Sequence, residues 1–502
     1  MRPRMTAVEG KIRVASNQTS AQSRFAVPKS RLSVRGLFRR LARGLRPAVA
    51  LALLSVFCLV QQADAYSVLS HEEVVDMAWQ NRIVPLLLAR FPDTNAEGLV
   101  TAHAYAYGGC VIQDIGYYPF GSHLFSDLLH YVRTGDFVSA LLRDATDVNE
   151  YAFALGALAH YASDIHGHPF INEITPQEYP KLRGVFGRLV TYDDDPIAHL
   201  RTEFGFDVVE VARGRYSQEN YRSFIGFQVS KPLLERAFQE TYGFDVKQIM
   251  PYEDLAITSY RRSISSLIPK MTHVALAKYG KQIKAETPNF DRKEFLYRFD
   301  RTEFEKTYGK EYLKPSRKAR FVAFLLGLLP KVGPLADLRL HMPNAKEQDL
   351  YLKSMNDTVD SYDTLLDQMK SPEAELHGPD LPDTDLDTGK QTASGEYRLA
   401  DLSYATLLEK LVAHPGVPIS MQLRDHLLFY YAEPTPPRTL NPNAKGERHA
   451  KDWTPADWPK VEADVELLRL ATLMPPPPQE PAVLPPGTQT MPAAEKLDKP
   501  GE

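Results

Sequence analysis

Apolar and polar positions alternate with a helical period through the first half of the chain. Residues 70–73, Ser-His-Glu-Glu, precede an apolar stretch and have the form of a capping box, which places His71 in the first turn of a helix. Residues 127–134 predict a second helix that ends at Gly135, and residues 136–142 predict a third. The pattern therefore favours a succession of helices.

Two aspartates are expected to begin longer helices. Asp147 precedes a strongly apolar segment, residues 151–165, which is long enough to be a buried central helix. Asp195 is followed by a proline and is the expected N-cap of a helix that carries His199 and Glu203. Helical patterns continue beyond these residues, and no strand alternation is sustained, so the predicted fold class is mainly α.

The chain is expected to have four parts. They are a leader (residues 1–65), a helical domain (66–345), a helical C-terminal region (346–473) and a disordered Pro-rich tail (474–502). Within the third part, residues 371–396 are polar and predict a linker, and residues 397–432 predict a helical pair.

The leader has the composition of a signal peptide. Arginines precede a short apolar run, residues 47–60, and an Ala-x-Ala ending predicts cleavage after Ala65. An uncleaved anchor is the alternative interpretation. Cleavage predicts a secreted or periplasmic protein. The leader carries twelve Lys/Arg and two Asp/Glu, so its removal changes the formal charge from −4 to about −14, and nothing resembles a nucleic-acid-binding surface.

Cysteine usage limits both redox chemistry and stabilisation. Cys58 is lost with the leader, which leaves Cys110 as the only cysteine of the mature chain and excludes an intramolecular disulfide. Cys110 follows two glycines and could be a nucleophile, but its apolar neighbours favour a buried thiol. Stability is then expected to come from the core or from bound metal.

Histidines and carboxylates are concentrated between residues 71 and 199. Eight of the fourteen histidines lie there, at positions 71, 103, 123, 130, 160, 166, 168 and 199. Zinc favours imidazole nitrogen together with carboxylate oxygen, and a hydrolytic site keeps one position open for water. The segment therefore offers the ligand set of a zinc hydrolase.

Two His-x-x-x-acid pairs give this chemistry a geometry. His160 with Asp164, and His199 with Glu203, each place two side chains on one helix face, about 5–6 Å apart. One such pair alone is more often a surface ion pair or a hydrogen-bonded core histidine. Two pairs in one segment favour a multinuclear metal site.

The remaining histidines are divided by position. His168 extends the face of His160 and Asp164 and, because Pro169 should open the helix there, is preferred as a ligand to His166. His130 on an amphipathic helix and His103 in an Ala/Tyr-rich helix are expected to be packing or surface residues. His123 in Gly-Ser-His and Asp114 are further candidate ligands.

With these residues in place, the segment from Tyr66 to about Glu203 resembles the zinc-dependent phospholipase C family, including the catalytic domain of glycosylphosphatidylinositol-specific phospholipase D and, more remotely, the single-strand-specific zinc nucleases. The motifs that carry the resemblance are residues 66–71 (Tyr-Ser-Val-Leu-Ser-His), Ser122-His123, residues 160–164 (His-Tyr-Ala-Ser-Asp) with His168, and residues 199–203 (His-Leu-Arg-Thr-Glu).

The resemblance implies three zinc ions in one cleft between helices. It assigns Asp114, His123, His160 and Asp164 to one zinc, and His168, His199 and Glu203 to the second. It assigns the amine and carbonyl of Tyr66, His71 and the bridging Asp164 to the third. A free α-amine can bind zinc, whereas an amide nitrogen inside the precursor cannot, so the uncleaved chain should lack a complete site.

The resemblance implies hydrolysis of a phosphodiester by metal-activated water, and it makes Asp114 the candidate that orients or deprotonates that water. A phospholipase of type C or type D is the leading hypothesis. A zinc nuclease of related fold is the first alternative, and a catalytically silent, zinc-stabilised binding protein is the second.

A lipid substrate calls for a surface that meets the membrane. Residues 314–335 have four cations before a short apolar run, too short to span a bilayer, which could lie in its interface. A buried core helix is the alternative interpretation of this segment. The segment favours lipid over nucleic acid, and stable nucleic-acid binding is not expected.

Overall fold

The protein is described by a computed structural model over residues 68–213, 228–262, 344–432 and 458–474. The leader, with Tyr66 and the expected cleavage site, lies outside the described residues, as do the candidate interfacial segment 314–335 and nearly all of the Pro-rich tail.

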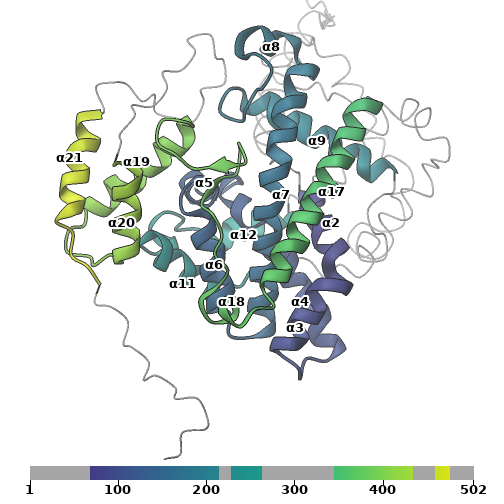
Figure 1. Cartoon of the computed structure of the whole chain (residues 1–502), viewed down its shortest axis with the longest axis horizontal. Coiled ribbons are helices and arrows are strands. Elements are labelled where there is room, and N and C mark those ends of the chain that lie inside the picture. Colours follow the sequence, from purple (N-terminus) through teal and green to yellow (C-terminus); the bar gives the residue numbers. More distant parts are fainter. Residues whose placement is uncertain (1–67, 214–227, 263–343, 433–457, 475–502) are drawn as a thin grey trace, which may run out of the picture. The chain divides into compact units, whose positions relative to one another are not determined.

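The described residues are almost entirely helical, which confirms the predicted fold class (Figure 1). The helices of the first half are α2 (Val68–Ala78), a π-helical turn (Trp79–Ile83), α3 (Val84–Arg90), α4 (Ala96–Gly109), the 3-10 turn η2 (Ile112–Tyr117), α5 (His123–Tyr131), α6 (Thr134–Asp144), α7 (Val148–Glu178), α8 (Pro180–Phe186), α9 (Pro196–Arg213), α11 (Lys231–Tyr242), η3 (Val246–Gln248) and α12 (Glu253–Arg262). The later elements are α17 (Ala345–Gln368), α18 (Pro372–His377), β1 (Thr384–Asp385), β2 (Lys390–Gln391), α19 (Arg398–Val412), α20 (Met421–Tyr430) and α21 (Trp458–Arg469).

Helix α7 is the central element, and α4 crosses it at short range. A Cβ atom at Gly109 of α4 would lie 1.8 Å from the Phe153 carbonyl oxygen, and one at Gly156 of α7 would lie 2.0 Å from the Ala106 carbonyl oxygen. Only glycine permits two helix backbones to approach this closely. The crossing brings the end of α4, where Cys110 follows, against the middle of α7.

The two expected aspartate caps are present. The Asp147 carboxylate accepts hydrogen bonds from the backbone N–H groups of Asn149 and Glu150 and begins α7. Asp195 Oδ1 accepts from the Ala198 N–H at 2.9 Å and begins α9. Both satisfy amide groups that have no partner within the first turn of a helix.

Ser70 is not the N-cap that the pattern at residues 70–73 predicts, because α2 already includes Val68. Ser70 therefore lies inside the helix, and its hydroxyl is hydrogen-bonded to the Tyr351 hydroxyl of α17 at 2.8 Å. Ser70 thus makes a contact with a residue that is remote in sequence.

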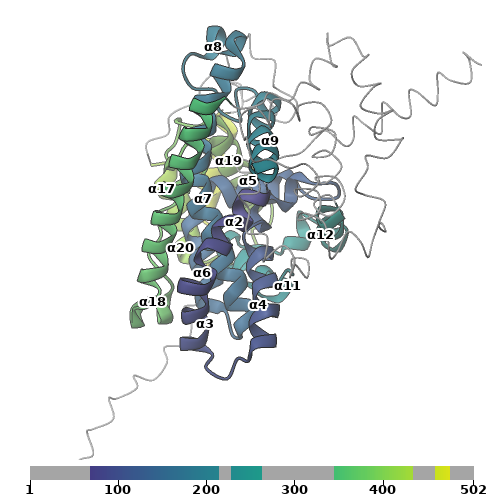
Figure 2. The same cartoon turned by 90° about the vertical axis from the view of Figure 1, so that its right-hand side faces the viewer.

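Helices from the second half of the chain pack against those of the first. Helix α17 runs beside α7 (Figure 2), where the Tyr362 hydroxyl donates to the Leu155 carbonyl at 2.8 Å and Ser354 donates to the His166 carbonyl at 3.0 Å. Helices α19 and α20 form the helical pair expected over residues 397–432, and α19 packs against α5.

Residues 371–396 are not the linker that their polar composition predicts. They contain α18 and a short antiparallel hairpin, β1–β2, in which Thr384 pairs with Gln391. Thr384, Asp385 and Asp387 are buried. The polar side chains of this segment are directed into the protein because they hydrogen-bond to α5, α6 and α7.

Among the described residues, no helix combines the length and apolar character needed to cross a membrane.

Candidate metal centre

Three groups of histidines and carboxylates, two of which share His160, converge on α7. We call them the Asp114 group (Asp114, His130, His160), the His71 group (His71, His160, Asp164) and the Glu203 group (His168, His199, Glu203). In each group one ligand atom per residue lies within 4.8 Å of the others, and every member is buried. Residues from α2, η2, α5, α7 and α9 thus meet in one place.

Helix α7 supplies the axis of the centre. His160, Asp164 and His168 follow one another at intervals of four residues and share a face. His160 Nε2 lies 2.9 Å from Asp164 Oδ2, and His168 Nε2 lies 3.7 Å from the same oxygen. The i, i+4 argument made from the sequence is therefore confirmed for this face.

The helix does not open at His168, as Pro169 was expected to make it do. Helix α7 continues through Pro169 to Glu178. Pro169 has no N–H to offer the Ile165 carbonyl, and the hairpin residue Gly389 covers that carbonyl. A Cβ atom at Gly389, which has φ +66°, would lie 2.6 Å from the Ile165 oxygen. Helix α7 thus stays continuous across the proline.

Asp164 occupies the middle of the centre. Its Oδ1 atom lies 3.5 Å from His71 Nε2, and its Oδ2 atom lies 3.3 Å from His130 Nε2. Together with the contacts to His160 and His168, this carboxylate faces four imidazoles and is 1 % exposed. Such a carboxylate can bridge cations that are held by the neighbouring groups.

Asp114 is placed by the 3-10 turn that follows α4. The adjacent Gln113 donates to the Ala157 carbonyl of α7 at 3.1 Å and holds this turn against the central helix. Asp114 Oδ1 then lies 3.2 Å from His130 Nε2 and 3.7 Å from His160 Nε2.

The hydrogen bonds of two rings indicate which nitrogen is available to a cation. His130 Nδ1 lies 2.8 Å from the Ser126 carbonyl, and His160 Nδ1 lies 2.9 Å from the Cys110 carbonyl. A carbonyl can only accept, so each Nδ1 carries the proton. In the neutral rings the Nε2 lone pairs then face the oxygens of Asp114 and Asp164.

This arrangement fits a cation. A buried lone pair directed at a buried carboxylate is repulsive unless a proton or a metal ion lies between them. Within the described residues, no hydrogen bond satisfies the carboxylate oxygens of Asp114 or Asp164. Imidazole nitrogens whose other ring nitrogen donates to a carbonyl, combined with carboxylate oxygens, are the donors of a zinc site.

The pKa shifts divide the rings into two kinds. Burial, the largest influence, lowers the pKa of His71 to about 3, and burial together with His168 lowers the pKa of His199 well below its usual value. For His130, burial opposes protonation, but Asp114 and Asp164 outweigh it and raise the pKa well above its usual value. A cation entering the Asp114 group therefore displaces a proton from His130.

The Glu203 group joins α7 to α9. His199 Nε2 lies 2.6 Å from Glu203 Oε1 and 3.1 Å from His168 Nδ1, and the rings of His168 and His199 are stacked. The cap at Asp195 positions His199 one turn and Glu203 two turns into α9. The pair read from the sequence is thus adjacent to the one on α7.

The structure does not bring His123 into any of the groups. It is the exposed first residue of α5, and its ring lies against Tyr117. His130, assigned from the sequence to packing or the surface, is the residue of α5 that meets Asp114 and Asp164. Its position on the buried face of an amphipathic helix was the available signal, because a buried imidazole requires a polar partner.

The other sequence assignments are simpler. His103 stacks on Trp79 and lies 3.0 Å from Asp76, as a packing residue would. His166 is half-buried and joins no group within the described part of the chain. Cys110 is buried, and burial raises the pKa of its thiol well above the usual value, so the buried-thiol interpretation is confirmed.

A fourth cluster lies apart from the centre, made of Asp136, Asp383 and His426. Arg133 already binds the Asp136 carboxylate at 2.6 and 2.7 Å, and the backbone N–H groups of Gly135 and Asp136 donate to Asp383. A cation is thus supplied by the chain itself, and this cluster has no need of a metal ion.

Comparison with known proteins identifies the segment that carries the centre. Residues 70–247 match the family described as zinc dependent phospholipase C, which confirms the family expected from the sequence. The matched residues include all three groups and support a phospholipid-hydrolysing zinc enzyme in general. No curated protein and no solved structure matches the chain.

Proposed function

Because residues 70–247 form a match to the zinc-dependent phospholipase C family, we propose that this protein is a secreted zinc phosphodiesterase that hydrolyses phospholipids, as a phospholipase of type C or type D. One observation carries the proposal: the carboxylate oxygens of Asp114 and Asp164 lie close to the Nε2 atoms of His130 and His160. These atoms form a buried set of metal donors, and within the described residues no Lys or Arg pairs with its two carboxylates.

The residues of the centre divide the work between them. Bound zinc supplies a water molecule of lowered pKa and positive charge that stabilises the phosphoryl oxygens. Asp164 holds His71, His130, His160 and His168 around one point. We assign Asp114 the role of orienting the attacking water or accepting its proton, because its carboxylate is buried beside His130 and has no hydrogen-bond partner among the described residues.

We propose three zinc ions per chain, and the three groups together with the expected N-terminus support this number. His71 and Asp164 offer two protein ligands to one ion, and the amine and carbonyl of Tyr66 would complete it after cleavage at Ala65. Secretion and metal loading are then linked, because an uncleaved chain has an amide at Tyr66 in place of the amine.

A phospholipid substrate requires access to a lipid surface, and the segment around α8 suits that role. Lys181, Arg183 and Arg188 are exposed and form no ion pair within the described residues, and residues 180–190 contain no Asp or Glu. Leu189 beside them is 56 % exposed. Cations next to exposed apolar side chains are typical of surfaces that bind anionic bilayers.

The position of α8 links this surface to the chemistry. Helix α8 follows the end of α7, which carries His168, and precedes α9, which carries His199 (Figures 1 and 2). Arg183 and Arg188 also line a cleft with Glu173 and Gln177 of α7 and Lys346 of α17, so three cations and one carboxylate face it. The partner we propose for this surface is an anionic phospholipid bilayer.

One experiment tests the proposal against its alternatives. The protein is isolated after export, its amino-terminal residue and bound zinc are determined, and hydrolysis of phospholipid micelles is compared with that of single-stranded DNA. We expect tyrosine at the N-terminus, three zinc ions and lipid cleavage. Diacylglycerol as product assigns type C and phosphatidic acid assigns type D. Cleavage of DNA alone would make it a zinc nuclease, and zinc without turnover would make it a binding protein.

A further inference from the structure

A carboxylate from the second half of the chain reaches the metal centre. Asp387, on the turn of the β1–β2 hairpin, is 2 % exposed, and its Oδ1 atom lies 3.5 Å from His168 Nδ1. His168 belongs to the Glu203 group. Asp387 is remote in sequence from the matched residues 70–247, and its segment was expected to be a linker.

Hydrogen bonds to its side chain and to its backbone fix the orientation of Asp387. Its Oδ2 atom accepts hydrogen bonds from the hydroxyls of Tyr131 (2.9 Å) and Tyr397. Its backbone carbonyl accepts from Asn172 Nδ2 of α7 at 2.7 Å. With one carboxylate oxygen occupied by two tyrosines, the other is directed towards His168.

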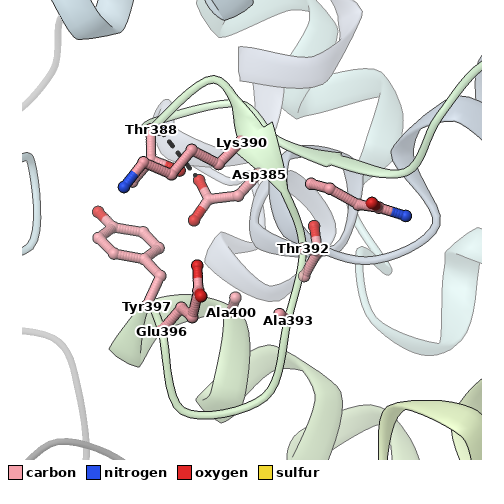
Figure 3. Close-up of a pocket in the computed structure, with 9 residues that line it drawn as sticks. Asp385, Thr388, Lys390, Thr392, Ala393, Glu396, Tyr397 and Ala400 are labelled. Carbon is pink, nitrogen blue, oxygen red and sulfur yellow. Dashed lines mark hydrogen bonds between the residues drawn. The ribbon is translucent and has the colours of Figure 1, made fainter.

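The turn that presents Asp387 is closed by Asp385. Asp385 Oδ1 accepts from the backbone N–H groups of Asp387 at 3.0 Å and Thr388 at 3.2 Å. Figure 3 shows Asp385 and Thr388 on the hairpin beside Tyr397, which enters from the start of α19. Such an Asx turn makes the position of the following carboxylate rigid.

The hairpin also contacts the ligand helix on the other side of the centre. The Leu386 N–H donates to the His130 carbonyl at 3.0 Å, and the Thr384 N–H donates to the Thr134 hydroxyl at 2.9 Å. His130 belongs to the Asp114 group. The hairpin therefore contacts a candidate ligand in each of two groups. It contacts the backbone of His130 in α5 and the ring of His168 in α7.

We propose that Asp387 is a positioning residue of the metal centre, which orients the His168 ring and strengthens cation binding by the Glu203 group. The proposal rests on the proposed zinc function. A carboxylate beside a ligand imidazole fixes the ring and increases its basicity, and the loss of such a partner lowers metal affinity by roughly tenfold to a hundredfold. The C-terminal half of the chain is then a part of the enzyme's metal site.

The test is metal affinity in the full chain, isolated after export. Asp387→Asn removes the charge and keeps the volume. Zinc content is measured after equilibration with a series of buffered free-zinc concentrations, and the visible spectrum of the Co²⁺-loaded protein reports ligand geometry. We expect one metal ion to bind roughly tenfold to a hundredfold more weakly in this variant, with an altered cobalt spectrum.

Asp401→Asn is the matched control. Asp401 is also a buried carboxylate of the C-terminal half, and it accepts a hydrogen bond from Tyr430 at 2.6 Å, but it belongs to none of the three groups. A purely structural role would make the two variants equal. Zinc affinity and a cobalt spectrum in Asp387→Asn that match those of Asp401→Asn and the parent would overturn the proposal.

Tyr397→Phe keeps the proposal testable if Asp387→Asn does not fold. This variant keeps the Asp387 charge and removes one of the two hydroxyls that hold it. We expect a weaker effect in the same direction, a few-fold loss of affinity for one ion. Unchanged affinity in a folded Tyr397→Phe would count against a positioning role. Because the readout is metal binding, the outcome does not depend on whether the substrate is a phospholipid.

Discussion

The Nδ1 atom of His130 lies 2.8 Å from the carbonyl oxygen of Ser126, one turn earlier in α5. This bond fixes the tautomer of the ring and leaves Nε2 directed at two buried carboxylates. A helix thus uses its own backbone to prepare one of its histidines for a cation.

The first prediction separates the two histidines of α5. Replacing His130 with Ala should remove about one bound zinc ion and reduce activity by more than roughly a hundredfold, because Asp114 loses the nearer of its imidazole partners. His123→Ala should leave zinc content unchanged, since that ring is exposed. Zinc analysis of both purified variants decides the point, and a loss confined to His123→Ala would refute the assignment.

The second prediction concerns the bridging carboxylate. Asp164→Asn should abolish activity and reduce bound zinc by more than one equivalent, because Asp164 faces residues of all three groups. Ser163→Ala is a suitable control, since among the described residues its hydroxyl bonds to the Ala159 carbonyl of the same helix. Full zinc content in Asp164→Asn would exclude the bridging role.

The third prediction is a pH dependence of stability. Burial, and then the neighbouring Glu347, raise the pKa of Glu178 to about 8. A carboxyl whose pKa is raised on folding stabilises the protein below its unfolded pKa, and that contribution is lost as the pH rises through the folded pKa. Between about pH 4.5 and pH 8, Glu178 therefore makes the fold progressively less stable.

Glu178→Gln should remove that dependence. Relative to the parent, the free energy of unfolding of the variant should rise with pH by an amount on the order of 1–3 kcal/mol between pH 5 and pH 9, because glutamine never ionises. Urea unfolding with zinc present at each pH measures it. Glu173→Gln, at an exposed position of the same helix, is the control. Parallel curves for Glu178→Gln and the parent would contradict the prediction.

The fourth prediction tests the lipid surface at α8. The double variant Arg188→Glu with Leu189→Ser should bind phosphatidylglycerol vesicles roughly tenfold to a hundredfold more weakly, since each cation near an anionic bilayer contributes about 1 kcal/mol. Hydrolysis of a soluble short-chain phospholipid should be unchanged. The same Arg-Leu pair occurs at Arg469 and Leu470, where Leu470 is 82 % exposed, and supplies a matched control.

Vesicle sedimentation compares the two double variants directly. Equal binding by both, at the level of the parent, would exclude α8 as the bilayer contact. A loss in the Arg469/Leu470 variant alone would transfer the contact to the end of α21.

Local chemistry was enough to predict the elements that carry the centre. Asp147 and Asp195 begin α7 and α9 as expected, because a capping carboxylate acts on amides two or three residues away. The spacing of His160 with Asp164, and of His199 with Glu203, likewise follows from the pitch of a single helix. In each case the interacting groups are close in the chain.

The contacts that the sequence did not predict depend on distant partners. Gly389 lies close to the Ile165 carbonyl of α7, although more than 200 positions separate the two residues. His130 was indistinguishable from a core histidine until Asp114 and Asp164 approached it from η2 and α7. The partner of Asp387, His168, lies far outside the polar segment 371–396, so the sequence of that segment did not indicate it.

The amino-acid sequence by itself determined the helical class, the caps of α7 and α9 and the two His-x-x-x-acid pairs, since all of these are set by intervals of a few residues. Only the tertiary structure decided that His130 and not His123 faces the centre, and that Asp387 reaches His168. The physical reason is that an isolated polar residue acquires its role from the charges that folding brings within a few ångströms of it. Those charges come from segments that are distant in the chain, and no periodic pattern in the sequence reports such a distance.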